Sequence, residues 1–483
     1  MEALVVRIRR AVLAPVCALV ALSLAACGSQ LDPDTVAAVN GTSVGPDGEV
    51  VAADGTVTGP DGSVPGSTGD GGSTTTAGGS TSTGGGSGEA QEGTGANSAT
   101  GGAKAGSCNG FKNQTGITDK TVVIGNASDV SGPVPGLFEA SQDAVRAYVA
   151  YFNATSDICG RKLELKAYDS RTDAAADQQA YAKGCDETFA MVGSMSAFDS
   201  GGAKTAQDCG LPDIRSASVT FDRQDCTTCY GAQSTVATEF QNAVPDFVKK
   251  NHPDAAKNAA MLYINAGAAA ENAEVQVSAM ENRGMTFDYV KGIDISEFNY
   301  APYVQEMKSK GIEYVQMIGA SAQFVRLADA MKQQGFDPEV FMLDPTAYTT
   351  EFVQNGGDAV EGTTLFINFT PFEEASSNKE LQLYMSWLQQ VKPGAEPSFF
   401  GLFSWSAARL FVERSITLGG RLSRQSLLAD VGKVDNWTAN GMHSPQHVGP
   451  RRTGECWRFI QLKGGRWVPV GGTKYLCSGT TSS

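Results

Sequence analysis

Histidine is scarce in this chain, with only three among 483 residues. His443 and His447 stand four positions apart, but Pro445 lies between them and argues against a shared helix face. No His-Glu-x-x-His motif occurs, and neither a Gly-x-Ser-x-Gly elbow nor a Walker loop follows a predicted strand. Carboxylates are plentiful, yet nothing singles out a catalytic pair. We therefore predict a protein that is not an enzyme and that needs no metal and no cofactor.

The N-terminal apolar stretch is too short to cross a membrane. Residues 11–26 are mostly apolar, and a spanning helix needs roughly 20 such residues. Three arginines precede the stretch, small residues end it, and Cys27 follows. This order is typical of an export signal, and a cysteine directly after the cut site resembles the lipobox of bacterial lipoproteins. We predict a lipoprotein signal peptide over 1–26 and lipidation of Cys27; the alternative is a secretory signal with an incidental cysteine.

Basic residues are outnumbered, with 37 Lys and Arg against 52 Asp and Glu and a formal charge of −15. An acidic protein of this kind is a poor partner for nucleic acid or for anionic lipid headgroups. Membrane attachment would then depend on the lipid, and lipoproteins of this type are expected to carry more than one acyl chain. We predict an extracytoplasmic protein anchored to the bacterial cell membrane through its N-terminal lipid, with no nucleic-acid partner.

Cysteine is abundant, with ten in the chain. Cys17 would leave with the signal and Cys27 would carry the lipid. The remaining even number predicts disulfides in an exported chain, although sequence cannot fix their pairing. Proximity suggests Cys185–Cys209, Cys226–Cys229, Cys456–Cys477 and, by remainder, Cys108–Cys159. A redox or zinc role for the Cys226-Thr-Thr-Cys229 segment is the alternative, but no second such motif exists and no histidine lies nearby.

Residues 27–107 have the composition of a linker. Gly, Ser, Thr and Ala dominate, and aromatic residues are absent. Such a segment cannot bury enough apolar surface to offset the entropy of ordering it. A near-repeat, Val44–Gly48 and Thr58–Gly62, predicts turns but no fold. We predict a flexible tether between the lipidated cysteine and a folded region.

From about residue 108 to 477, short apolar runs alternate with helical patterns. Predicted strands cover 121–125, 163–168, 190–193, 260–264, 314–318 and 340–343, and predicted helices include 138–152, 174–189 and 269–283. This alternation predicts parallel sheets covered on both faces, and its length predicts more than one lobe. Ligands of such sheets bind beyond the carboxyl ends of the strands. The relevant loops are 126–136, 194–199, 215–221, 264–269, 319–322 and 344–349.

Four stretches of the folded region carry a recognisable pattern. They are Val122–Gly125 with the following Ser131-Gly132-Pro133, Gly160–Leu165, Val192–Ala197, and Asn299–Lys308 followed by Gly311–Val315. In order and spacing these stretches resemble the type I periplasmic solute-binding proteins, the branch that serves branched-chain amino acid and amide ABC importers. The resemblance covers essentially all of 118–477.

The resemblance implies an α/β fold of two doubly wound parallel-sheet lobes joined by a three-strand hinge. Lobe 1 would hold 118–236 plus 370–446, and lobe 2 would hold 237–369 plus 447–479. A small polar organic ligand, an amino acid or an amide-like molecule, would bind between lobes that close around it. A monomer would then present the ligand to an ABC permease. The alternative is a ligand-sensing receptor lipoprotein of the same fold.

The family's ligand contacts can be carried over by position. In lobe 1, loops after strands would offer hydroxyl or N–H groups to a ligand carboxylate. In lobe 2, a strand end would offer an aromatic residue and a carboxylate would pair with a ligand ammonium. The eight candidates are Ser196, Ala197, Phe198, Ser218, Thr220, Tyr263, Asp344 and Tyr348.

The chain departs from the family pattern in lobe 2. Residues 265–270 read Asn-Ala-Gly-Ala-Ala-Ala and residues 319–321 read Gly-Ala-Ser, where charged or aromatic residues are common. We expect a small and apolar lobe 2 wall. Either a bulkier ligand fills the space, or the ligand lacks a standard α-amino acid head group.

Overall fold

The computed structural model describes residues 104–483 and three two-residue strands, β1 (Ser43–Val44), β2 (Val50–Val51) and β3 (Val57–Thr58). The three strands pair in antiparallel fashion around the near-repeat, for which only turns were predicted. The predictions for the signal peptide, for lipidation of Cys27 and for the rest of the tether up to residue 103 lie outside the described residues.

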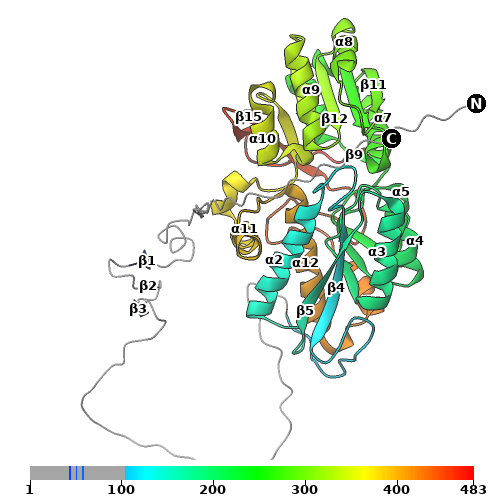
Figure 1. The fold of residues 1–483 in the computed structure, drawn as a ribbon, viewed down its shortest axis with the longest axis vertical. Coiled ribbons are helices and arrows are strands. Elements are labelled where there is room, and N and C mark those ends of the chain that lie inside the picture. The colour runs from blue at the N-terminus through cyan, green and yellow to red at the C-terminus, as the bar shows by residue number, and fades with distance from the viewer. Residues whose placement is uncertain (1–42, 45–49, 52–56, 59–103) are drawn as a thin grey trace, which may run out of the picture. The chain divides into compact units, whose positions relative to one another are not determined.

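Lobe 1 is built on a five-stranded sheet with the order β5-β4-β6-β7-β8, in which every pairing is parallel (Figure 1). Its strands are β4 (Thr121–Ser128), β5 (Lys162–Asp169), β6 (Ala190–Val192), β7 (Asp213–Ala217) and β8 (Cys229–Gln233). Its helices are α2 (Glu139–Thr155), α3 (Ala174–Glu187), α4 (Ser200–Asp208), α5 (Phe221–Asp225), α11 (Lys379–Val391), α12 (Phe399–Leu418) and α13 (Arg424–Val431), with 3-10 turns η5 (Phe372–Ser377) and η6 (Gly419–Arg421). Helices α2 and α12 cover one face of the sheet, and α3 and α4 cover the other.

Lobe 2 contains the larger sheet, with the order β11-β10-β12-β13-β14-β15-β16 and with β17 paired to β15. The strands are β10 (Ala259–Ile264), β11 (Phe287–Ile293), β12 (Tyr314–Ile318), β13 (Val340–Leu343), β14 (Thr364–Ile367), β15 (Cys456–Lys463), β16 (Arg466–Val470) and β17 (Leu476–Cys477). Pairing is parallel as far as β14 and antiparallel beyond it. The helices are α6 (Ala243–Asn251), α7 (Gly267–Asn282), α8 (Ala301–Ser309), α9 (Ser321–Gln333) and α10 (Thr350–Gly356), with 3-10 turns η2 (Ala255–Lys257), η3 (Pro345–Ala347) and η4 (Gly357–Ala359). A separate pair joins β9 (Glu239–Gln241) to the C-terminal β18 (Thr480–Ser482).

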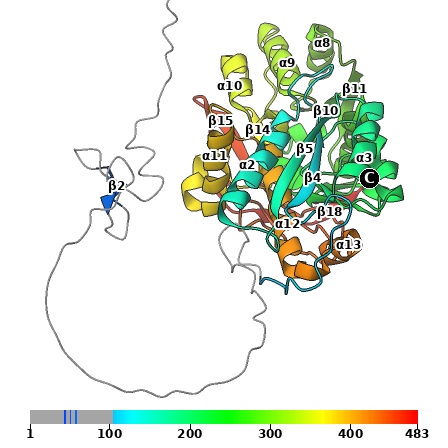
Figure 2. The ribbon, with the colours of Figure 1, turned by 60° about the horizontal axis from the view of Figure 1, so that its bottom comes forward.

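The first five strands of each sheet follow the same order, second-first-third-fourth-fifth along the chain. In this order the chain reverses direction across the sheet between the first and third strands, which is the place where doubly wound folds bind ligands. The two switch points are therefore β4/β6 in lobe 1 and β10/β12 in lobe 2. Figure 2 labels the first strand of each sheet, β4 and β10, beside its other neighbour, β5 and β11.

Three crossing segments connect the lobes, near residues 234–238, 367–370 and 443–455. Ser234 and His447 are joined because the His447 N–H donates to Ser234 Oγ at 2.8 Å. The Ser444 N–H donates to the Asn368 carbonyl at 2.8 Å. These bonds hold the three segments side by side as a hinge.

The fold class predicted from sequence is confirmed, and so are the four disulfide pairs Cys108–Cys159, Cys185–Cys209, Cys226–Cys229 and Cys456–Cys477. The predicted strands 314–318 and 340–343 match β12 and β13. Within the described part of the chain, no helix is both long enough and apolar enough to cross a bilayer.

Candidate ligand-binding cavity

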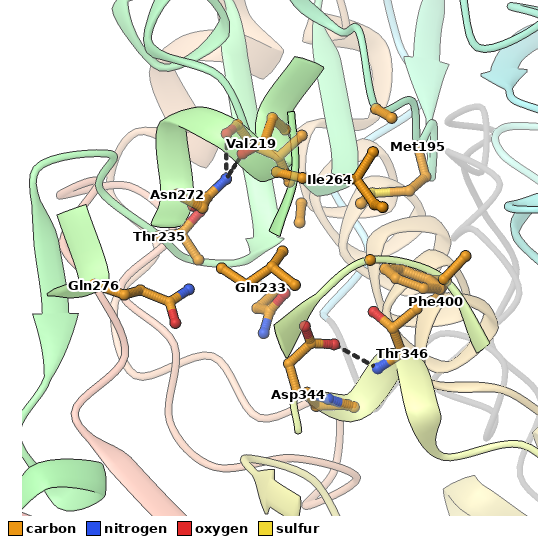
Figure 3. A pocket seen from close by; sticks show the side chains of 18 of the residues that line it. Met195, Val219, Gln233, Thr235, Ile264, Asn272, Gln276, Asp344, Thr346 and Phe400 are labelled. Atoms are coloured by element: carbon orange, nitrogen blue, oxygen red, sulfur yellow. Dashed lines mark hydrogen bonds between the residues drawn. The ribbon is translucent and has the colours of Figure 1, made fainter. Parts of the chain in front are cut away.

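A cavity of about 250 Å³ lies between the two lobes, at both switch points. Loops that follow strands β6 and β7 line it from lobe 1, and loops that follow β10, β12 and β13 line it from lobe 2. Residues of the hinge close its remaining side. Figure 3 shows Met195, Ile264 and Phe400 gathered on one side of the cavity, and Gln233, Gln276 and Asp344 on the other.

The lobe 1 wall is an aromatic and aliphatic surface. Leu137 and Phe138 come from the loop before α2, Met195 follows β6, and Phe400 comes from the first turn of α12. The rings of Phe138 and Phe400 pack edge to face with their centroids 4.6 Å apart. Because these residues pack against one another as well as lining the cavity, they form one continuous apolar surface.

The lobe 2 loops that follow β10 and β12 are small and apolar, as the sequence predicted, whereas Asn272, Gln276 and Gln323 of helices α7 and α9 add amide side chains to this wall. Ala266, Ala268 and Ala269 follow β10, and Gly319 and Ala320 follow β12. Short side chains leave room in the cavity, so this wall limits the ligand's shape less than the lobe 1 wall does.

In the part of the chain that the structure describes, Asp344 is one of two acidic residues of lobe 2 that line the cavity, and Glu239 is the other. Asp344 directly follows β13, and its Oδ1 accepts a hydrogen bond from the Thr346 N–H at 2.7 Å, which caps η3. Burial raises the pKa of the Asp344 carboxyl, and the hydrogen bond from Thr346 opposes this rise. No Arg, Lys or His is among the lining residues in this described part of the chain.

In the lobe 1 loop after β6, a carboxylate of the protein itself binds the hydrogen-bond donors. Asp129 follows β4 and is fully buried. Its Oδ2 accepts the Ala197 N–H at 2.8 Å, and its Oδ1 accepts the Ser196 hydroxyl at 3.1 Å. The Thr172 N–H and the Ser170 hydroxyl also donate to Oδ1, at 2.9 and 2.6 Å. The donors of this loop are therefore already engaged inside the lobe.

In the lobe 1 loop after β7, called the second loop below, another aspartate binds the donors in the same way. Asp199 is fully buried, and it accepts the Val219 N–H at 3.1 Å and the Thr220 hydroxyl at 2.5 Å. Arg215 lies behind Asp199, with a nitrogen 3.4 Å from its carboxylate. Arg223 also contributes, because its Nε donates to the Asp199 carbonyl at 2.7 Å.

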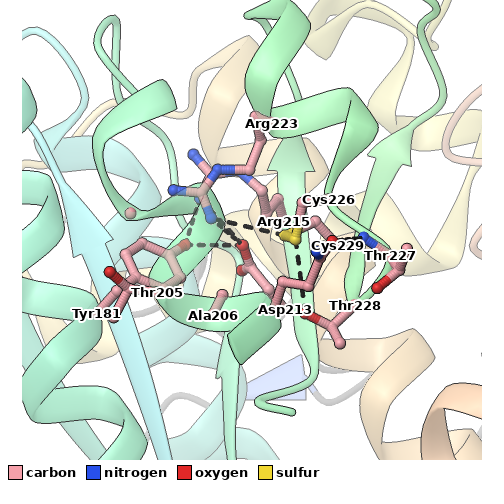
Figure 4. The surroundings of a disulfide bond; sticks show 12 residues. Tyr181, Thr205, Ala206, Asp213, Arg215, Arg223, Cys226, Thr227, Thr228 and Cys229 are labelled. Atoms are coloured by element: carbon pink, nitrogen blue, oxygen red, sulfur yellow. Dashed lines mark hydrogen bonds and ion pairs between the residues drawn. A yellow bond between two sulfur atoms is a disulfide. The ribbon is translucent and has the colours of Figure 1, made fainter. Parts of the chain in front are cut away.

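Arg215 and Arg223 belong to a buried ionic cluster beside the Cys226–Cys229 disulfide (Figure 4). Arg223 pairs with Asp177 at 2.8 Å and with Asp213 at 2.9 Å, and it stacks on the ring of Tyr181. All of the charged side chains in these pairs are inaccessible to solvent. The cluster therefore supports the second loop from within lobe 1.

Helix α7 of lobe 2 contacts the lobe 1 loops directly. The Ala268 N–H donates to the Ala197 carbonyl at 2.9 Å, and Asn272 Nδ2 donates to the Val219 carbonyl at 3.0 Å. Gly267 begins the helix with a φ of +52°, and a Cβ there would stand 2.5 Å from the Ala197 carbonyl oxygen. Glycine is therefore required at this position for the two lobes to meet.

Three of the eight predicted contact residues line the cavity, namely Ala197, Phe198 and Asp344. Ser196 and Thr220 instead hold Asp129 and Asp199, as described above.

The remaining three predicted residues lie elsewhere. Ser218 lines a second cavity of about 300 Å³ behind β8. Tyr263 packs against the core on the opposite face of β10, because side chains alternate along a strand, and Ile264 takes its place in the cavity. Tyr348 is buried among Phe369, Phe372 and Trp467, and its hydroxyl bonds Glu373.

Sequence reasoning missed the residues that decide the character of the site. Asp129 and Asp199 were visible as acidic residues directly after predicted strands or in their loops, yet their engagement with Ala197 and Val219 depends on the fold. Phe400 is about 200 residues from these loops along the chain, and no local pattern connects it to them.

Comparisons with known proteins agree with this architecture. The family model described as "Periplasmic binding protein" matches residues 121–466. A comparison with curated protein sequences gives no match.

Solved structures of similar fold include three substrate-binding proteins. A fatty acid ABC transporter substrate-binding protein from Thermomonospora curvata has a TM-score of 0.66 and 17% identity, covering 76% of this chain and 95% of its own. The branched-chain amino acid transporter substrate-binding protein from Streptococcus pneumoniae in complex with isoleucine has a TM-score of 0.62 and 14% identity, covering 74% and 99%. An R. palustris solute-binding protein in complex with 4-hydroxybenzoate has a TM-score of 0.62 and 16% identity, covering 74% and 98%.

Proposed function

Because the chain belongs to the periplasmic binding protein family, we propose that it is an extracytoplasmic, lipid-anchored receptor that delivers a small organic ligand to an ABC permease. The family is one of solute-binding receptors, not of enzymes. The observation that carries the proposal is the cavity at both switch points, where α7 of lobe 2 meets the lobe 1 loops. A ligand held there contacts both lobes, so it favours the closed form by its contacts with the second lobe.

The proposed contacts come from the cavity lining. Ala197 and Phe198 would contact the ligand from lobe 1 and Asp344 from lobe 2. The ligand itself is open at the level of the fold, because similar structures are named for ligands as different as isoleucine and 4-hydroxybenzoate. An amino acid or amide-like ligand is the class that the family resemblance favours.

Ligand binding is tested by thermal unfolding of residues 108–483 exported to an oxidising compartment. The panel holds amino acids, amides, amines, peptides, organic acids and sugars. A true ligand at a hundred times its dissociation constant adds about 2.7 kcal/mol of stability, which raises the unfolding midpoint visibly. A restricted set of hits is expected. No stabilisation by any compound would contradict a solute receptor.

Membrane anchoring is tested by Cys27→Ser in the full-length chain. The variant lacks the thiol that carries the lipid, so it should leave the membrane fraction while the wild-type protein remains in it. Fractionation followed by immunoblotting measures this, with Cys17→Ser as the matched control because that residue lies within the predicted signal. Retention of Cys27→Ser in the membrane fraction would contradict the lipid anchor.

A further inference from the structure

The cavity is surrounded by negative charge without a matching cation. Asp344 and Glu239 line it, and Asp129 lies directly behind the lobe 1 loop, bonded to two residues, Thr172 and Ala197, that do line it. No Arg, Lys or His is among the described lining residues. An anionic ligand group would therefore face two carboxylates in the lining and a third behind it, with no cationic side chain among the described lining residues.

Three donors of the lobe 1 loops after β6 and β7 that could bind a ligand carboxylate are already bound to carboxylates of the protein. Asp129 takes the Ala197 N–H and the Ser196 hydroxyl, and Asp199 takes the Val219 N–H. A ligand carboxylate could reach these groups only by displacing a buried aspartate, which would lose its own hydrogen bonds. Asp129 and Asp199 thus occupy the positions in which a ligand carboxylate could accept these hydrogen bonds.

The buried arginines offer no compensation. Arg215 and Arg223 are inaccessible to solvent, and both are paired with buried aspartates, Asp213 among them. Two guanidinium groups are shared among three carboxylates in this cluster, so neither is available to a ligand.

The unfulfilled polar groups of the cavity suit a neutral or cationic head group. Asp344 accepts one hydrogen bond, from Thr346, and its carboxylate faces the cavity. Thr172 lines the cavity, and its buried hydroxyl has no hydrogen-bond partner among the residues that the structure describes. An amine satisfies the first group, and an amide can satisfy either.

We infer that this cavity takes mainly apolar amines and amides and discriminates against ligands with a free carboxylate. The inference rests on the proposed function and narrows its ligand class. The apolar walls supply the attraction for the ligand's carbon skeleton, and the internal carboxylates supply the repulsion that specificity requires. A zwitterionic amino acid is excluded by the same carboxylates as a simple acid.

The test uses two sets of compounds that differ only in head group. The first set is 2-phenylethylamine, 3-phenylpropanamide, phenylalanine and 3-phenylpropanoate, and the second is the corresponding series with an isobutyl group. Calorimetric titration of the unchanged protein should give an affinity for the amine and the amide at least tenfold above that of the two carboxylates. A carboxylate or zwitterion that binds as tightly as its amide would overturn the inference and leave the proposed function standing. No binding by these compounds or by the wider panel would contradict the proposed function and the inference together.

Two variants test whether Asp129 and Asp344 cause the discrimination against carboxylate ligands. Asp129→Asn removes a charge with little change of shape and should reduce the penalty on 3-phenylpropanoate at least threefold. Asp344→Asn keeps an oxygen for the Thr346 N–H and should weaken 2-phenylethylamine at least tenfold while changing 3-phenylpropanamide less than threefold. Asp208→Asn and Asp337→Asn, which alter exposed aspartates outside the cavity lining, are the controls. If neither test variant changes the ratios of the affinities for amine, amide and carboxylate, the inference is overturned. If Asp129→Asn does not fold, the titrations of the unchanged protein decide the inference.

Discussion

The two walls of the cavity are built on the same strand order and differ in how their polar groups are used. In lobe 1, Asp129 and Asp199 hold the loop donors from within, and a buried ionic cluster supports the second loop. In lobe 2, the loops are short alanine and glycine segments, and Asp344 faces the cavity. Lobe 1 therefore presents a mainly apolar wall with the Thr172 hydroxyl, whereas lobe 2 presents the Asp344 carboxylate.

This difference teaches that one fold can place recognition on either lobe. Parallel strands of both sheets end at the cavity, so each lobe could offer N–H groups to a ligand. In lobe 1, Asp129 and Asp199 occupy the Ala197 and Val219 N–H groups. We therefore expect the ligand's head group to contact lobe 2, through Asp344.

The largest expected effect comes from breaking the buried cluster of lobe 1. Arg223→Met leaves Asp177 and Asp213 buried without a principal partner. Removal of one member of a buried ion pair costs about 3–5 kcal/mol. Urea unfolding should show a loss of that size in the free energy of unfolding.

The matched control is an exposed ion pair of lobe 2. Arg283 and Asp246 are 2.9 Å apart with side chains 40% and 35% exposed. Arg283→Met should cost less than about 1 kcal/mol, because exposed pairs contribute little. Equal losses of unfolding free energy in the two variants would contradict the contrast between the buried ionic cluster of lobe 1 and the exposed ion pair of lobe 2.

Histidines extend the comparison to acid stability. His443, in the hinge, donates or accepts at both ring nitrogens within the core, and burial lowers its pKa to about 4. The unfolded chain binds this proton at a higher pH than the folded chain, so acidification favours unfolding. The stability is complete above pH 6.5 and falls by up to about 3 kcal/mol as the pH is lowered towards 4.

The measurement is the free energy of unfolding between pH 7 and 4. His443→Gln should remove this part of the slope, whatever its effect on stability at neutral pH. His252→Gln, which alters a partly exposed histidine of lobe 2, should retain the slope. A wild-type slope in His443→Gln would show that the buried histidine is not its source.

The smallest effect concerns the contact between the lobes. Gly267→Ala places a methyl group against the Ala197 carbonyl and forces alanine into a left-handed backbone. The backbone term costs about 1–2 kcal/mol, and the clash additionally opposes closure. We expect a loss of stability of that size together with at least tenfold weaker ligand binding.

Gly335→Ala separates the cost of the left-handed backbone from the cost of the clash between the lobes. Gly335 has a φ of +57°, but nothing lies within 4 Å of an added Cβ. This variant should lose similar stability and keep its ligand affinity. Equal affinities in the two variants would contradict the importance of the contact made by α7.

Much of the fold could be predicted from local patterns, whereas the character of the site could not. The runs that became β12 and β13 are short, mostly apolar and bounded by turns, so their composition and length were sufficient. Strands β14 to β16 were not predicted. The β14–β15 pairing joins segments that are far apart in the chain, whereas the β15–β16 hairpin around Gly464-Gly465 carries a local turn signal that the sequence analysis did not use. Cysteine proximity identified the disulfides because three of the four pairs are local.

The predicted site residues show the same division. Asp344 could be placed because it directly follows a strand whose end was predicted well. Tyr263 was placed one residue away from the side chain that enters the cavity, an error that reverses the face of a strand. The roles of Asp129 and Asp199 follow from loop geometry, which no sequence period encodes.

The most direct test of the account is a crystal structure of the protein with the ligand identified by the binding screen. The account predicts that the ligand's polar head lies within hydrogen-bonding distance of Asp344, while Asp129 still accepts the Ala197 N–H and Asp199 still accepts the Val219 N–H. A ligand carboxylate bound to those two N–H groups, with the aspartates turned away, would contradict it.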